Sequence, residues 1–312
     1  MAKPVNKITL GVDVAKDELV IWRWGCDSPI TLPNQATEIA AWLKALYGPV
    51  RLAIEPTSHY HLAFVEAALA HGAAVYLVNP RQLAHYRHAV NLRHKTDAMD
   101  AYLLARYLAH EATQLRPFQP QSRQAQQLWS LLSRRATVVQ SRQRLQQSFA
   151  SAAVSIRALL TQFAQLLQRL DQQIQHLIRT LGWWADYRRC LSIPGIGPAN
   201  AAALVAAYHR GAFASSDAFV AFLGLDIRLR ESGRFKGKRK LTKRGAPELR
   251  RLLYCGAKAA CTYQRFAAYR QRLLDQGLSK IAARVALARK LARIAFTLMN
   301  NQQYFSDRPQ MA

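Results

Sequence analysis

The sequence predicts an α/β N-terminal domain, then long paired helices, and then an all-α C-terminal domain with a helix-hairpin-helix turn. Three observations lead to this prediction. Short apolar strand-like runs alternate with helical segments over the first 110 residues, and apolar residues recur every seven positions over 121–180. A Pro-Gly-Ile-Gly turn then lies between two helical segments. We expect the domains to span 1–118, 119–182 and 183–312.

The N-terminal region has the pattern of one mixed sheet with helices between its later strands. The strand-like runs are 8–15, 18–25, 28–33, 50–56 and 73–80. The helical segments are 36–48, about 60–71 with a start at Thr57-Ser58, and one that begins around Asp97. Three meandering strands followed by alternating helices and strands is the order of a ribonuclease H-like fold.

The middle region is rich in Gln, Arg, Ala and Leu and follows a break at Pro117 and Pro120. One series of apolar residues with a spacing of seven is Leu131, Val138, Leu145, Ala152, Leu159 and Leu166. A second series, four residues after members of the first, is Phe149, Ile156, Phe163, Leu170 and Leu177. This is the a/d seam of paired helices. The partner helix belongs either to the same chain or to another subunit, and we expect dimerisation ahead of an internal hairpin.

The charge of the chain favours a polyanionic partner. The 44 Lys and Arg residues against 18 Asp and Glu give a formal net charge of +26, which is typical of a nucleic-acid-binding protein. No run of eighteen apolar residues and no N-terminal signal peptide appear, so we expect a cytoplasmic protein without a membrane partner. The four cysteines lack paired spacing, which argues against a zinc knuckle.

The densest basic segment is 228–251, which also contains Ser232, a hydroxyl nucleophile candidate. Ser215 and Ser216 are weaker candidates, because their setting in AFASSDAF is more typical of a helix N-cap. We predict nucleic-acid contacts at Arg228, Arg230, Arg234, Lys236, Lys238, Arg239, Lys240, Lys243 and Arg244. Gly195 and Gly197 of the Pro-Gly-Ile-Gly turn are predicted to present backbone N–H groups to a phosphate. The alternative for this turn is an ordinary connection between packed helices.

Four carboxylates form a candidate metal site. Asp13 lies inside an apolar strand, and Glu55 ends a later one. Asp97 and Asp100 are three residues apart and so share one helical face. Any one of them alone is better explained as a cap or an ion-pair partner. The four together predict Mg²⁺ or Mn²⁺, which prefer oxygen ligands. Arg93 and Lys95 are either counter-ions or phosphate contacts.

Two blocks of motifs resemble the DEDD transposases of the insertion-sequence-110 family, which are related to the Piv-type DNA invertases. The first block is GVDVAK, IEPTSHY, VNP and KTDAMDA, and the second is SIPGIG, FLGL, RESG, LTKRG and LRRLLY. The likeness covers nearly the whole chain. One departure is Arg234-Phe235-Lys236 after RESG, where relatives often have extra serines or small residues.

This resemblance implies a RuvC-like domain in which Asp13, Glu55, Asp97 and Asp100 hold Mg²⁺. It implies that Ser232 attacks DNA to form a phosphoserine–DNA intermediate. It further implies a bridge RNA that pairs with donor and target DNA, and a homo-oligomer, dimer or tetramer, in which the two sites meet across subunits.

We therefore expect an RNA-guided transposase or recombinase. One alternative is a metal-only junction resolvase, in which water attacks and Ser232 only binds phosphate. A second is a site-specific DNA invertase without an RNA guide. A third is a non-catalytic architectural or RNA-binding protein, which would leave the four carboxylates unexplained.

Overall fold

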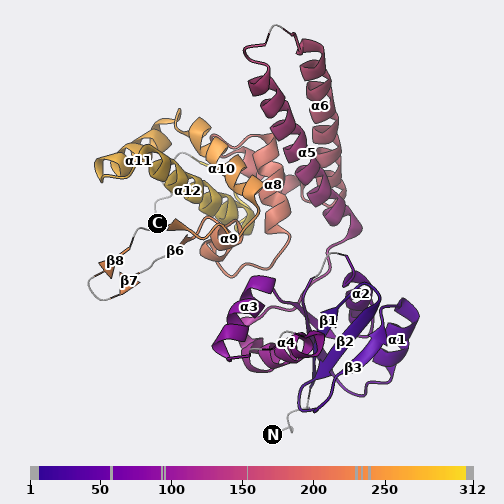
Figure 1. The fold of residues 1–312 in the computed structure, drawn as a ribbon. Helices are drawn as coiled ribbons and strands as arrows, with labels where there is room; N and C mark the ends of the chain where they lie inside the picture. The colour runs from indigo at the N-terminus through magenta and orange to yellow at the C-terminus, as the bar shows by residue number, and fades with distance from the viewer. Residues whose placement is uncertain are drawn as a thin grey trace. The chain divides into compact units, whose positions relative to one another are not determined.

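The structure is a computed structural model that describes residues 7–56, 59–92, 94, 96–152, 154–228, 231–232, 235–237 and 240–306. For Glu231, Ser232, Phe235 and Lys236 it describes the backbone only. The chain forms two compact units, Met1–Pro120 and Gln121–Ala312, which are treated separately below (Figure 1). Among the described residues, no helix has the length and apolar character needed to cross a membrane.

The N-terminal unit is built on a five-stranded sheet. Its strands are β1 (Ile8–Val14), β2 (Glu18–Arg23), β3 (Ile30–Pro33), β4 (Val50–Ile54) and β5 (Ala74–Leu77). Their order across the sheet is β3-β2-β1-β4-β5. The β1–β2 and β2–β3 pairs are antiparallel, whereas β1–β4 and β4–β5 are parallel. The predicted mixed α/β character of this region is confirmed.

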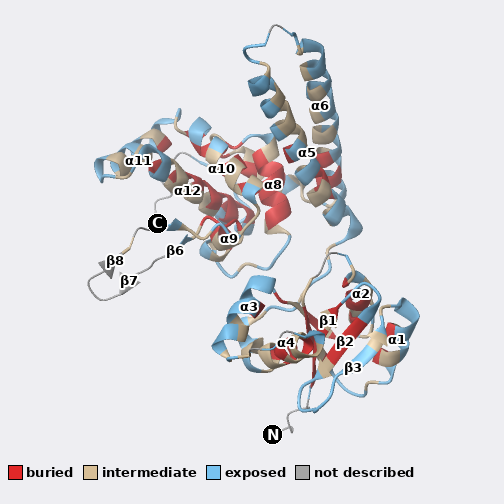
Figure 2. Cartoon of the chain, in the orientation of Figure 1, coloured by how far each residue is buried: buried red, intermediate tan, exposed pale blue. Residues whose placement is uncertain are grey.

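Helices cover both faces of this sheet. On one face, Leu10 and Val12 of β1 pack with Ile39 of α1 (Ala36–Lys44) and Phe64 of α2 (Leu62–Ala70). On the other face, α4 (Asp97–Glu111) packs against β1, β2 and β4. Because side chains alternate along a strand, Gly11 and Asp13 of β1 face α4. Figure 2 shows the buried layer along the sheet.

Gly11 sets the distance between α4 and the sheet. A Cβ atom at this position would lie 2.0 Å from the carbonyl oxygen of Ala101 and 2.3 Å from the backbone nitrogen of Ala105. These are backbone atoms of α4, which cannot rotate away as a flexible side chain could. Only glycine therefore allows the helix to lie this close to β1.

The sequence prediction missed helix α3 (Pro80–Ala89), which follows β5. Its start carries a recognisable signal, because the side chain of Asn79 accepts a hydrogen bond of 2.9 Å from the backbone of Arg81, and Pro80 occupies the first helical position. The predicted start of the preceding helix at Thr57-Ser58 lies outside the described residues, and α2 begins at Leu62.

In the C-terminal unit, α5 (Arg123–Ser148) and α6 (Arg157–Thr180) pair within one chain as a hairpin (Figure 1). This corrects the expectation that pairing between subunits would come first. The loop between them interrupts the heptad count, so Ala152 lies in the loop. Beyond it, Leu159 and Leu166 are 39% and 43% exposed rather than in the seam. The apolar residues keep a spacing of seven in the sequence through the loop, but this spacing has no structural meaning where the chain is not helical.

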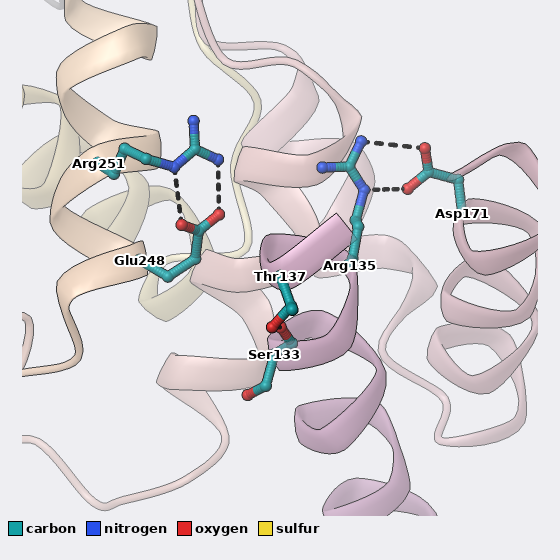
Figure 3. A network of polar contacts seen from close by, with 6 residues as sticks. All are labelled: Ser133, Arg135, Thr137, Asp171, Glu248 and Arg251. Carbon is teal, nitrogen blue, oxygen red and sulfur yellow. Dashed lines mark hydrogen bonds and ion pairs between the residues drawn. The ribbon is translucent and has the colours of Figure 1, made fainter. Parts of the chain in front are cut away.

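A polar contact holds the two helices of the hairpin together, and its base packs against the rest of the unit. Figure 3 shows Arg135 of α5 donating two hydrogen bonds to Asp171 of α6, at 2.6 and 3.1 Å. Leu128 and Ile178, one from each helix, belong to the large C-terminal core. The guanidinium of Arg210 also lies 4.6 Å from the centre of the Trp129 ring. The base of the hairpin is therefore part of this core.

The described part of the C-terminal unit contains six further helices. They are α7 (Trp184–Leu191), α8 (Pro198–Tyr208), α9 (Ser216–Phe222), α10 (Pro247–Ala260), α11 (Gln264–Asp275) and α12 (Lys280–Asn300). The predicted N-cap at Ser215 is confirmed, since its hydroxyl accepts a hydrogen bond of 3.2 Å from the backbone of Ala218. Helix α8 is buried along nearly all its length and contacts α7, α10 and α12.

The basic segment forms short strands, so the predicted all-α character of this unit is corrected. Strand β6 (Ile227–Arg228) pairs with β9 (Lys240–Leu241), and β7 (Glu231–Ser232) pairs with β8 (Phe235–Lys236). Many cations in 228–244 are four residues apart, as in Arg230 and Arg234, and would repel one another on a helix. In an extended strand, residues four apart are separated by about 13 Å, roughly twice their separation on a helix, so the repulsion is weaker. We call 227–244 the basic arm.

The base of the basic arm is held by close backbone packing. A Cβ atom at Gly245 would lie 2.4 Å from the carbonyl oxygen of Phe222, and one at Gly224 would lie 2.4 Å from the nitrogen of Gly245. The backbone N–H of Thr242 donates to the carbonyl of Asp226 at 3.0 Å. The FLGL and LTKRG motifs thus meet at one point of the fold.

We predict that Gly11→Ala destabilises the protein by at least about 2 kcal/mol, because the added methyl collides with the backbone of α4 and overpacks the sheet–helix interface. Urea unfolding followed by circular dichroism measures the change. Gly211→Ala is the control, since its Cβ would meet Phe213 at an ordinary 3.4 Å. Equal stability of both variants would show that α4 can retreat from β1 without cost.

Candidate functional site

Asp13 and Glu55 come together at one edge of the sheet. In the parallel β1–β4 pair, Val12 lies opposite Ile54, so the next residues along both strands are Asp13 and Glu55. Val12 and Ile54 belong to the core on the α1–α2 face, and the following residue of each strand therefore points toward α4. Glu55 follows β4 rather than lying inside it.

Asp97 and Asp100 occupy the first turn of α4. Thr96 caps the start of the helix, and its hydroxyl accepts a hydrogen bond of 3.3 Å from the backbone of Met99. Ala101 touches β1 at Gly11, and the charges of Asp97 and Asp100 act on Asp13, so the first turn of α4 lies toward the carboxyl end of that strand. The helix thus brings two carboxylates toward the edge where Asp13 and Glu55 lie.

The electrostatics of Asp13 show that the four carboxylates share one neighbourhood. Burial and, after it, the negative charges of Asp100, Asp97 and Glu55 together raise the pKa of Asp13 from 3.8 to about 6. A hydrogen bond with the backbone of Val14 acts in the opposite direction. Repulsion of this kind favours a proton or a cation among the carboxylates.

Arg87 is a site residue that sequence reasoning missed. It lies on α3 and forms an ion pair with Asp100, while its Nη1 donates a hydrogen bond of 2.9 Å to the carbonyl of His94. The signal that could have found it is the Asn79-Pro80 helix start. Arg93 and Lys95, the cations expected beside these acids, lie outside the described residues.

The donor set fits a hard divalent cation in its chemistry. All four side chains are carboxylates, the ligands that Mg²⁺ and Mn²⁺ prefer, and a cation would relieve the repulsion at Asp13. Within the described part of the chain, no three His, Cys, Asp or Glu side chains already converge as a metal site would require. Asp100 is turned to Arg87 instead.

The predicted phosphate turn lies between α7 and α8. Gly195 packs against α10, since a Cβ atom there would lie 2.6 Å from the carbonyl oxygen of Gly256. Gly197 is the exposed N-cap of α8, with open space where its Cβ would be. Of the two glycines, Gly195 thus has a packing role, and phosphate binding stays a prediction for both.

The basic arm is only partly described. Four of its predicted nucleic-acid contacts are exposed in the structure: Arg228, Lys240, Lys243 and Arg244. Arg230, Arg234, Lys238 and Arg239 lie outside the described residues, and the side chain of Lys236 does too. For Ser232 the structure gives the pairing of its backbone with Phe235 and leaves its hydroxyl outside the described atoms.

Comparison with known proteins gives two matches to family models and three similar proteins. Residues 10–158 match a DEDD transposase model of the IS110 type, and residues 187–271 match the transposase family IS116/IS110/IS902. The pilin gene-inverting proteins of Moraxella lacunata and Moraxella bovis are each 28% identical over 97% of this chain and 99% of their own. A probable family 20 transposase of Pseudomonas aeruginosa is 36% identical over 44% of this chain and 41% of its own.

We predict that Asp13→Asn stabilises the metal-free protein at neutral pH. With its pKa raised from 3.8 to about 6, the folded state binds more protons than the unfolded state within that interval. Stability therefore falls as pH rises through the interval and stays low above it. After allowance for solvent screening, the expected gain is about 1–2 kcal/mol at pH 7.5 and close to zero below pH 4. Urea unfolding in EDTA measures it.

Asp27→Asn is the matched control, because Asp27 is exposed in the loop after β2. It should change stability little at either pH. A gain from Asp13→Asn that does not depend on pH would contradict the electrostatic account of the site.

Proposed function

Because the chain belongs to the IS110 family of transposases, we propose that it cuts and rejoins DNA strands with two sets of residues, a carboxylate metal site and a serine nucleophile. The metal site would comprise Asp13, Glu55, Asp97 and Asp100, and the nucleophile would be Ser232. The observation that carries the proposal is the gathering of four acids around one strand end in a chain of net charge +26.

The carboxylates would act on the DNA phosphate. A bound Mg²⁺ or Mn²⁺ supplies Lewis-acid stabilisation of negative charge on phosphate oxygens. The side chains would set its position, with Asp13 and Glu55 fixed by the sheet and the two α4 acids fixed by the helix. Asp100 would have to leave Arg87, so the guanidinium would become free to pair with a DNA phosphate.

Ser232 would carry the covalent step. Its Oγ attacks phosphorus, the O–P bond to serine forms, and the bond to the 3′ oxygen breaks. The hydroxyl proton ends on the released 3′ oxygen, and no net energy input is needed because one phosphodiester replaces another. Attack by the 3′ hydroxyl of a second strand then reverses the step and frees the serine.

Strand order and charge support the roles that we propose for the separate parts of the chain. The order β3-β2-β1-β4-β5, with a meander and then parallel strands, supports a RuvC-like variant of the ribonuclease H fold. The α5–α6 hairpin would serve as a coiled coil, and the α7–α8 turn as a helix-hairpin-helix contact to DNA. The exposed cations of the basic arm would bind the DNA backbone. We further propose a bridge RNA as guide and a homo-oligomer as the active form.

Site-specific DNA inversion is the second candidate, because proteins called pilin gene-inverting protein align with nearly the whole chain. The RNA that co-purifies with the protein separates the candidates. An RNA that maps to DNA flanking the gene supports guided transposition. Full recombination by RNA-free protein on paired inverted sites supports inversion without a guide.

We predict that Asp13→Ala and Asp100→Ala each lower strand cleavage at least about 100-fold, because each removes a ligand of the cation that stabilises phosphate charge. Cleavage of a labelled DNA substrate is measured beside gel-shift affinity, which should change less than about 3-fold. Asp171→Ala, which removes the acid paired with Arg135, is the control. Normal cleavage by both site variants would rule out the carboxylate centre.

We predict that Ser232→Ala abolishes a covalent protein–DNA adduct that the unmodified protein forms on a nicked suicide substrate. Denaturing electrophoresis detects the adduct, and mass spectrometry locates the phosphorylated residue. Ser215→Ala, which removes only a helix cap, should keep the adduct. An adduct that persists in Ser232→Ala would assign the nucleophile elsewhere, and active cleavage without any adduct would favour attack by water.

A further inference from the structure

A row of four aromatic rings lies on the α4 face of the N-terminal sheet. The Trp22 and Tyr102 rings are 5.3 Å apart between centres and meet at 76°. Trp24 lies 5.9 Å from Tyr102 at 33°, and His110 lies 5.4 Å from Trp24 at 83°. Each ring thus contacts the next; Trp22 lies in β2, Trp24 follows its last residue, and Tyr102 and His110 lie on α4.

The row begins close to the carboxylate site. Asp13 lies opposite Val20 in the β1–β2 pair, and Gly11 lies opposite Trp22. Because alternate residues share a face, Val20, Trp22 and Trp24 all point to the side that α4 covers. At about 3.4 Å per residue, Trp22 is about 7 Å and Trp24 about 14 Å along the strand from Asp13. These are spacings of one to two nucleotides in an extended strand.

Core packing explains the positions of Trp22 and Tyr102 but not those of Trp24 and His110. Leu103, Leu104 and Leu108 of α4 are wholly buried and fill the helix–sheet core. Trp22 and Tyr102 are half-buried beside them, as packing residues would be. Trp24 remains 36% exposed and His110 is exposed, so the outer rings present surface to solvent that the described N-terminal unit does not cover.

Cations accompany the rings. Arg106 lies one helical turn after Tyr102 and one before His110, and hydrogen bonds with Tyr102 and Tyr86 raise the pKa of its guanidinium. Arg23 is exposed between the two tryptophans in the sequence. Rings interleaved with guanidinium groups bind bases through their flat faces and phosphates through charge. The acids nearest to the rings in sequence are Asp27, Glu111 and Asp100, of which Asp100 is paired with Arg87.

We propose that Trp24, Tyr102 and His110 form a stacking surface for an unpaired DNA base next to the carboxylate site. The surface fits an unpaired base because a ring face is available only when a base leaves the duplex stack. Strand exchange separates strands beside the cut, which supplies such a base. The inference rests on the proposed function for the identity of the DNA strand, and the stacking itself needs no metal.

The test measures binding of the full-length chain to fluorescent oligonucleotides in EDTA. Trp24→Ala should weaken binding of single-stranded DNA about 10-fold, the loss of one stacked base, and binding of the matching duplex less than 2-fold. Trp24→Phe should retain most of the affinity. Trp42→Phe is the matched control, because Trp42 lies on α1 and packs with the opposite face of the sheet.

A second measurement does not depend on how the variants fold. Single-stranded DNA carrying 5-iodouracil is irradiated with the unmodified protein, and mass spectrometry should place the cross-link on Trp24 or Tyr102. Unchanged affinity in a folded Trp24→Ala, or cross-links only elsewhere, would overturn the proposal. Tighter binding of RNA of the same sequence through Trp24 would overturn the assignment to DNA. If a second protein copy covers Trp24, the cross-link will not form, and this result would also overturn the proposal.

Asp13→Asn separates this inference from the proposed function. The variant should keep both the cross-link and the single-strand affinity while it loses cleavage. Unchanged single-strand affinity together with normal cleavage in Trp24→Ala would reject only the stacking surface and leave the metal site intact.

Discussion

The close approach of α4 to β1 at Gly11 is the contact on which the candidate site depends. A helix normally lies on a sheet with side chains between the two backbones. Here the missing side chain lets backbone atoms of Ala101 and Ala105 reach the strand. The first turn of the same helix carries Asp97 and Asp100, while the strand carries Asp13. One glycine thus controls the distance between acids that belong to distant parts of the sequence.

Acids are scarce in this chain, and four of its 18 are concentrated where they repel one another. Such a cluster costs stability, since burial and neighbouring charges both oppose ionisation of Asp13. The ion pair between Arg87 and Asp100 offsets part of this cost. A protein under selection for stability alone would have little reason to keep the arrangement, and we interpret it as a cost accepted for chemistry on an anionic substrate.

The C-terminal unit carries many positive charges on one segment, the basic arm. Its core is formed by α8, α10 and α12 with the base of the α5–α6 hairpin. The basic arm projects from that core as short strands whose base is pinned by the contact between Gly224 and Gly245. Backbone packing at that base thus anchors the segment that carries the cations and Ser232.

The sequence by itself determined the five strands, the acids at the strand ends and helix start, the cap at Ser215 and the basic segment, because alternation, capping and charge are local properties. It could not place Arg87 beside Asp100, since that pair depends on α3 folding back onto α4. It also misjudged the heptads, because a count of seven continues through a loop while the helix axis reverses. The aromatic row from Trp22 to His110 exists only once β2 meets α4, so tertiary packing alone decided it.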